Sequence, residues 1–244
     1  EIPTGAERVR IRLMSRLSYL NWFARGVVPT LWSHLAEMNR AECYLPSLEL
    51  AQAWSEHAPA LSMVPLHSRG IRYGENSLKI RRAHGHRWGM AQSLHFLGLA
   101  QHSACKLQES KSNLQQAVDI FEQTGDLWEA NTVRYQLGLV HFRLGDPELA
   151  IESSKQVYRS GIEAGDDQAS GISLHCWAIA ASGDVPAEII QTELNRERAD
   201  AQVTAQVLLA EAIRLFYAND LEEALARLDE AIICIRKNTL RSVY

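Results

Sequence analysis

Part of this sequence repeats itself with an offset of 40 positions and no gap. Three aligned pairs carry the repeat: Trp88 with Trp128, Leu97-Gly98 with Leu137-Gly138, and Gly125-Asp126 with Gly165-Asp166. Gly85-His86 continues the series one period upstream. A fixed period of this size is typical of one supersecondary unit that is copied and stacked, because a lone helical hairpin cannot bury its own apolar face. The repeat therefore constrains the fold strongly, and it indicates binding without naming what is bound.

The residues between these markers follow helical periodicity. Small and apolar residues recur at helical spacing from Trp88 to Ala100, and only seven prolines occur in the whole chain. Gly125 stands where a left-handed cap would end a helix, and Pro147 suits the first turn of the next one. Further helices are expected over residues 6–23, 31–41, 48–57 and 70–82. The sequence predicts an all-α fold, a right-handed α-solenoid of about six antiparallel helix pairs.

The repeat signal is uneven along the chain. We expect divergent helical hairpins over residues 1–87, clear 40-residue repeats over 88–184, and one or more C-terminal hairpins over 185–244. Pro186 and the polar run at 195–198 interrupt the period before the last segment. All three segments are expected to form one continuous solenoid. Because the chain opens on Glu1 rather than Met, we interpret it as a piece of a larger protein.

Composition excludes several function classes. With 46% hydrophobic residues, 22% charged residues and a formal net charge of −4, the chain lacks the basic field that binds a nucleic-acid backbone. No uncharged apolar run is long enough for a membrane span. The four cysteines stand far apart, which favours a reducing, cytoplasmic compartment over disulfides or a zinc site.

The repeated residues resemble the tetratricopeptide repeat. Leu137-Gly138, Gly145-Asp146, Ala150 and Val157 match its pattern in register, and the second half matches again at residues 219–231. The units here are longer than the family's about 34 residues. In this they are similar to the helical sensor arms of large bacterial signalling proteins, in which an ATPase core, sometimes with a kinase or cyclase domain, precedes the arm. The resemblance covers residues 88–183 and 205–235.

The resemblance implies a groove lined by the first helix of each pair. The residues carried over to it are His95, Leu99, His102, Thr132, Tyr135, Leu139, Phe142, Arg143, Ile172, His175 and Ile179. His95, Tyr135 and His175 share one offset and would form a column of rings, suited to an extended peptide or an aromatic ligand. The competing interpretation is that these rings pack against neighbouring hairpins or face solvent. The family's Lys/Asn carboxylate clamp is missing, so no chaperone-tail binding is expected.

Catalytic and metal-binding patterns are weak. His84 and His86 form the only close histidine pair, but they stand at an expected helix end, where imidazole caps carbonyls. Asp166-Asp167 lacks a third carboxylate and is expected to cap the next helix. No nucleotide-binding, hydrolase or metalloprotease motif occurs. The sequence predicts no catalysis, no metal and no cofactor in this segment.

These observations predict a protein- or peptide-binding sensor arm of a larger signalling or ATPase protein. Its partners would be a protein or peptide, with intramolecular contact to an attached ATPase, kinase or cyclase domain and self-association through apolar ends. Nucleic acid and membrane are not expected partners. Two alternatives remain open. One is a constitutive assembly scaffold, and the other is a helical enzyme or small-molecule receptor with a closed pocket.

Overall fold

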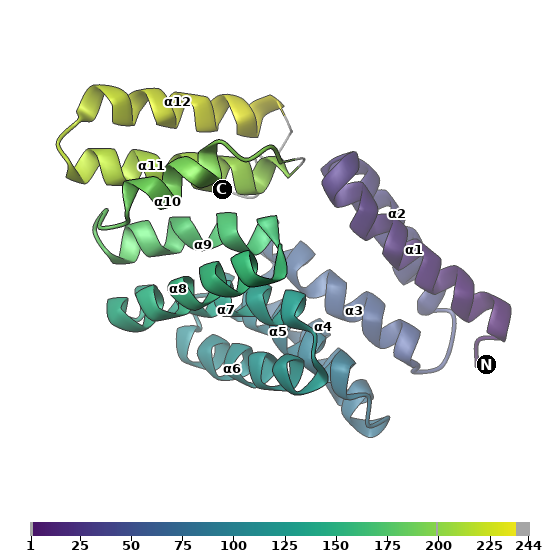
Figure 1. Ribbon diagram of the computed structural model, residues 1–244. Coiled ribbons are helices and arrows are strands. Elements are labelled where there is room, and N and C mark those ends of the chain that lie inside the picture. Colours follow the sequence, from purple (N-terminus) through teal and green to yellow (C-terminus); the bar gives the residue numbers. More distant parts are fainter. Residues whose placement is uncertain (1, 199, 238–244) are drawn as a thin grey trace. The chain divides into compact units, whose positions relative to one another are not determined.

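The computed structural model describes residues 2–198 and 200–237, and within these ranges it contains twelve α-helices and no strand (Figure 1). The predicted all-α class is confirmed. The last positions of the C-terminal segment, 238–244, lie outside the described residues. The chain divides into two compact units, the first ending at Gly125 and the second beginning at Asp126.

The first unit consists of antiparallel helices that follow one another closely in sequence. Its core includes the buried side chains of Ile11, Met38 and Leu50, with Trp54 and Tyr73 packed against them. Figure 1 shows α1 and α2 running side by side in opposite directions. The helices are α1 (Gly5–Ala24), α2 (Val27–Ala41), α3 (Leu48–Ser62), α4 (His67–Ala83), α5 (Arg87–Ser103) and α6 (Leu107–Thr124).

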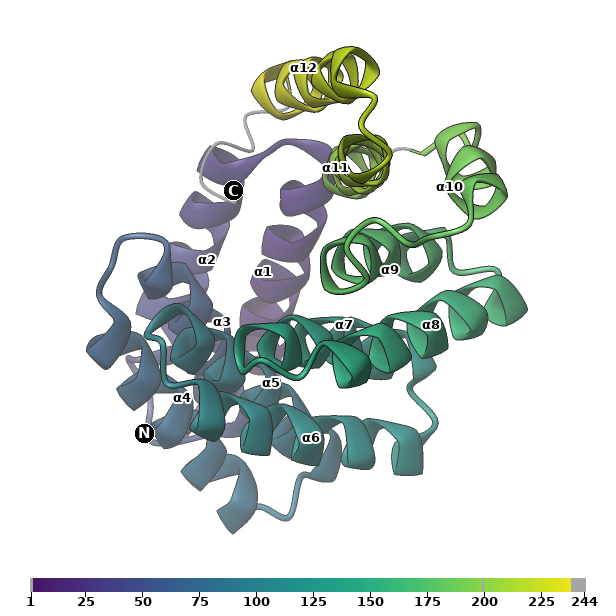
Figure 2. The ribbon, with the colours of Figure 1, turned by 90° about the vertical axis from the view of Figure 1, so that its left-hand side faces the viewer.

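The second unit repeats the plan with one short helix inserted. Its core is built around Leu174, Trp177 and Val207. Figure 2 shows α9 and α11 lying side by side, with the short α10 beside them. The helices are α7 (Leu127–Arg143), α8 (Pro147–Ala164), α9 (Asp167–Ala180), α10 (Ala187–Leu194), α11 (Ala201–Tyr217) and α12 (Leu221–Lys237).

The predicted helix ends are confirmed where the sequence contains a specific signal. Gly125 and Gly165 follow α6 and α8 in the left-handed conformation, with φ of 76° and 66°. Pro147 is the first residue of α8. The Asp166 carboxylate accepts hydrogen bonds from the backbone N–H groups of Gln168 and Ala169, both at 3.1 Å. It caps α9 as expected.

Gly98 lets the two helices of a pair approach closely. A Cβ added there would lie 2.7 Å from the Leu114 side chain, which belongs to α6 and is fully buried. Gly138 is less crowded, with the Ser153 Cβ at 3.4 Å and the Cys176 Sγ at 3.2 Å from the same added atom. The glycines that mark the repeat thus stand at close helix contacts, tighter at Gly98 than at Gly138.

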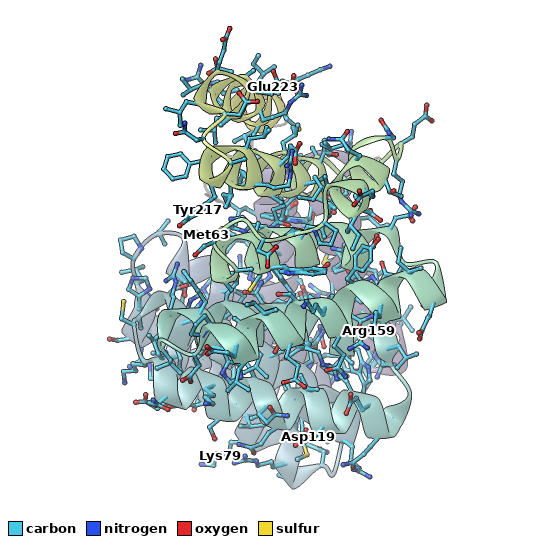
Figure 3. All side chains as sticks on the ribbon, turned by 60° about the vertical axis from the view of Figure 1, so that its left-hand side comes forward. Met63, Lys79, Asp119, Arg159, Tyr217 and Glu223 are labelled. Carbon is cyan, nitrogen blue, oxygen red and sulfur yellow. The ribbon has the colours of Figure 1, made fainter. Side chains whose placement is uncertain are left out.

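Charged side chains project from the outer faces of several helices. Figure 3 shows Lys79, Asp119 and Arg159 projecting from α4, α6 and α8. Trp128, one of the residues that mark the repeat, is 37% exposed. No helix in the described part of the chain is long and apolar enough to cross a membrane.

Candidate functional site

The predicted groove residues of the first unit lie on α5. His95 is buried, with 3% of its surface exposed, and burial lowers its pKa to about 4, so the ring is neutral at pH 7. Its ring stacks obliquely on Phe96, with centroids 5.0 Å apart. Leu99 and His102 are half-buried. His95 is therefore a core residue, and Leu99 and His102 retain accessible surface.

The predicted residues of α7 fall into two kinds. Tyr135 is buried in the core of the second unit, and its hydroxyl accepts a 2.7 Å hydrogen bond from Nε2 of Gln206 on α11. Phe142 and Arg143, at the end of the helix, are exposed. Thr132 and Leu139 are half-buried.

The predicted residues of α9 pack beside those of α7. Ile172 is buried, whereas His175 and Ile179 are half-buried. Burial lowers the pKa of His175 to about 4. Tyr135 and His175 thus lie on two helices that pack together in the second unit, while His95 belongs to the first. The groove stays a prediction, and Tyr135 would contribute to it mainly by supporting the helices.

A pocket of about 310 Å³ opens in the first unit, in a region where the sequence predicted no site. It lies among α1, α3, α4 and the start of α5. Cationic residues predominate among the charged groups around it. The residues that line it are Arg12, Ser15, Arg16, Leu48, Glu49, Gln52, Arg81, His86 and Trp88.

Arg81 is the most constrained cation of this pocket. It is 2% exposed, and its guanidinium donates to the Gly89 carbonyl at 2.5 Å and to Gln92 Oε1 at 2.8 Å. It also donates to the Ser93 hydroxyl and to Gln52. All four acceptors are uncharged. Burial lowers the Arg81 pKa to about 10, which leaves the group positive at neutral pH.

The other pocket arginines differ in their partners. Arg12 donates to a single oxygen of Glu49 at 2.7 and 3.0 Å, so this pair is close to neutral as a unit. Arg16 lies on the same helix, one turn further on, and is exposed. With Arg12 and Glu49 offsetting each other, Arg16 and Arg81 give the pocket a net positive charge. An anionic group is the chemical species that this arrangement would attract.

His86 and Trp88 complete the wall. The His86 Nδ1 accepts a 3.1 Å hydrogen bond from the Gly89 N–H, so the ring caps the start of α5 rather than the carbonyls at the end of α4. Partial burial, with the positive charge of Arg81 next in importance, lowers its pKa. Trp88 meets Phe121 edge to face with centroids 6.0 Å apart. Trp88 thus gives an otherwise polar pocket an aromatic side.

Comparison with known proteins identifies the class of fold. No protein-family model matches the chain, and no curated protein matches its sequence. Among solved structures, a Rap protein complexed with Competence and Sporulation Factor superposes with a TM-score of 0.75 at 16% identity. The match covers 96% of this chain and 65% of that one.

Aspartyl phosphate phosphatase F from Bacillus subtilis superposes with a TM-score of 0.66 at 14% identity, covering 93% of this chain and 60% of that one. This chain therefore spans less than two thirds of the length of either structure. Identities this low show the fold alone. The fold is that of the tetratricopeptide-like helical-repeat proteins, and the predicted resemblance is confirmed.

Proposed function

We propose that this chain binds a protein or peptide partner, and that the pocket of the first unit holds an acidic group of that partner. The observation that carries the proposal is Arg81, a buried cation in the pocket wall whose four hydrogen-bond acceptors are all neutral. Glu56 acts on Arg81 only at a distance. A buried charge without an opposite charge in direct contact is costly, and a bound carboxylate would offset that cost. Trp88 at the rim suits an apolar neighbour of the acidic group.

The fold supports the same kind of function. Stacked helix pairs present extended surfaces that helical-repeat proteins use for binding. One of the two similar structures is a complex with a factor, which is a property of that protein. We propose that this chain also binds a protein or peptide partner.

We further propose that this segment is a regulatory arm of a larger signalling protein, such as an ATPase. The arm would act by binding and not by catalysis. The resemblance of the 40-residue units to such arms supports it. Because one of the similar structures is a phosphatase of aspartyl phosphate, the purified chain should also be assayed with acetyl phosphate. Accelerated hydrolysis of this acyl phosphate would contradict the proposal that the segment is not catalytic.

A peptide selection tests the pocket directly. Random peptides displayed on phage are selected against the chain, and affinities are measured for the enriched sequences by fluorescence anisotropy. We expect acidic sequences to be enriched, and Arg16→Gln to weaken their binding about tenfold or more, as expected for losing a charged contact. Arg10→Gln is the matched control, since Arg10 is an exposed arginine of α1 that does not line the pocket.

The groove predicted from the sequence gives a competing outcome of the same experiment. If Phe142→Ala weakens the selected peptides while Arg16→Gln leaves their affinity unchanged, the pocket is not the site and the groove takes its place. Enrichment of neutral or basic sequences would equally count against an anion-binding pocket.

A further inference from the structure

A cluster of two carboxyl groups and two imidazoles lies where α2 packs against α3 in the first unit. His34 and Glu37 are one helical turn apart on α2 and share a face. Glu56 and His57 are consecutive residues of α3. His34 is 5% exposed and Glu37 is fully buried. Four ionisable side chains thus meet between two helices, with His34 and Glu37 buried and Glu56 and His57 half-buried. None of them belongs to the groove predicted from the sequence.

Glu37 has an unusual environment for a buried acid. Both of its carboxylate oxygens are buried and have no hydrogen-bond partner. Buried polar atoms are nearly always hydrogen-bonded, because desolvating them without a partner costs free energy. Apart from the neighbouring Glu56 carboxyl group, no residue that the structure describes offers the Glu37 oxygens the compensation that folding normally provides.

The distances from His34 to the two carboxyl groups do not correspond to hydrogen bonds. His34 Nδ1 is 3.9 Å from Glu37 Oε2 and 4.0 Å from Glu56 Oε2. Both separations exceed the range for a hydrogen bond. The potential ligand atoms of the three residues all lie within 4.8 Å of one another. Ligands about 2.0–2.2 Å from a tetrahedral zinc ion lie about 3.3–3.6 Å apart, so small side-chain rotations would close the set around one ion.

The remaining atoms of these residues are held by groups that would orient them. His34 Nε2 is 2.9 Å from His57 Nδ1, and the two rings stack with centroids 5.2 Å apart. When His34 donates this hydrogen bond through Nε2–H, the lone pair of its Nδ1 faces the two carboxyl groups. Metal-binding histidines commonly use their second nitrogen in this way.

Glu56 is oriented in a comparable manner. Its Oε1 accepts hydrogen bonds from the Ser15 hydroxyl at 2.8 Å and from Gln52 Nε2 at 2.5 Å, which leaves Oε2 facing His34. Ser15 and Gln52 also line the pocket described above.

The charges around the cluster also suit a cation. The ligand atoms of two carboxyl groups and His34 lie within 4.8 Å of one another, and the carboxyl groups would repel each other when both are ionised. Arg16 from α1 and Arg81 from α4 act on them only at a distance. A divalent ion between the carboxylates would offset that repulsion.

We propose that His34, Glu37 and Glu56 bind one divalent transition-metal ion, Zn²⁺ being the best fit, with His57 positioning His34. One nitrogen and two carboxylate oxygens suit Zn²⁺ better than Ca²⁺ or Mg²⁺, which prefer all-oxygen sites with more ligands. Water completes the coordination. The bound ion would tie α2 to α3 beside the pocket. This inference is independent of the peptide-binding proposal, and either can fail alone.

Metal titration of the EDTA-treated protein tests the proposal. We expect one Zn²⁺ per chain by calorimetry, a higher melting temperature with Zn²⁺, and visible absorption from tetrahedral coordination when Co²⁺ is used instead. Glu37→Gln keeps the shape of the side chain and removes one ligand charge. It should weaken Zn²⁺ binding about 100-fold or more, since even losing a supporting residue typically costs 10–100-fold.

Two further variants make the outcome decisive. His34→Asn should abolish the Co²⁺ absorption while the helical circular dichroism stays native. His84→Gln is the control, because His84 is exposed and belongs to the histidine pair that the sequence makes conspicuous. The proposal is overturned if the native chain binds no Zn²⁺ at micromolar concentrations, if Glu37→Gln and His34→Asn bind it as tightly as the native chain, or if His84→Gln alone removes binding.

Discussion

The hydroxyl of Tyr135 accepts a 2.7 Å hydrogen bond from Nε2 of Gln206, a residue 71 positions later in the chain. The bond joins α7 to α11 within the second unit, and both side chains are buried, at 6% and 4% exposure. Oε1 of Gln206 already has no hydrogen-bond partner. Tyr135 therefore does two things at once: its ring fills the core, and its hydroxyl satisfies a buried amide.

Tyr135→Phe isolates the second of these roles. The ring stays, but Gln206 Nε2 loses its partner in a buried site, so we expect a loss of about 1–3 kcal/mol in the free energy of unfolding. Urea denaturation followed by circular dichroism measures it. Gln206→Leu is the matched single variant, and the double variant Tyr135→Phe, Gln206→Leu removes both polar groups and leaves no unpaired donor. If the double variant loses as much stability as the two single variants together, the hydrogen bond does not couple the two residues.

Gly98→Ala tests the close approach of α5 and α6. The added methyl group would stand 2.7 Å from Leu114, which is fully buried and has little room to move. We expect destabilisation of about 1–3 kcal/mol from overpacking. Gly5→Ala is the control, since nothing lies within 4 Å of a Cβ added there. Thermal unfolding of the two variants side by side measures the difference, and equal melting temperatures would contradict the packing argument.

Arg81→Met tests the buried cation of the pocket. Methionine fills part of the volume, but Gln52 and Gln92 lose their common donor, and so does the Gly89 carbonyl. We expect a loss of about 2–4 kcal/mol in the free energy of unfolding, as several buried acceptors become unpaired. Arg82→Met is the natural comparison, because Arg82 is the exposed neighbour on the same helix and should change stability by less than about 0.5 kcal/mol.

The repeat was sufficient to predict the fold, because it depends on local patterns that recur. The cap at Gly125 and the first turn at Pro147 follow from backbone preferences of single residues. The pocket has no such signal. Arg81 and Arg82 are identical in type, and only the packing of α3 and α5 around α4 makes one buried and the other exposed.

The histidine and carboxyl cluster was missed for a related reason. His34 and Glu37 have ordinary helical spacing, and Glu56 comes 19 positions after Glu37 on a different helix. The sequence draws attention to His84 and His86 instead, because they are close together along the chain. Proximity in space between α2 and α3 arises from tertiary packing in the part of the chain where the repeat signal is weakest.

His95 makes the free energy of unfolding fall as the pH falls. Its pKa is about 4 in the folded chain, because burial disfavours the charged ring, against 6.5 for an exposed histidine. Between these two values the unfolded chain binds more protons than the folded chain. The contribution of His95 is therefore fully present above pH 6.5 and is lost as the pH falls toward 4.

Other buried groups titrate in the opposite sense, so the effect must be measured as a difference between two proteins. Glu37 and Glu56, whose pKa values are raised by burial, favour folding as the pH falls, and they do so equally in the native chain and in His95→Gln. From pH 7 to pH 5, we expect the native chain to lose about 2 kcal/mol more stability than His95→Gln. Urea titrations of both proteins at the two pH values provide the four free energies that are needed. A difference near zero would mean that His95 titrates normally in the folded state and is accessible to solvent, as a groove residue would be.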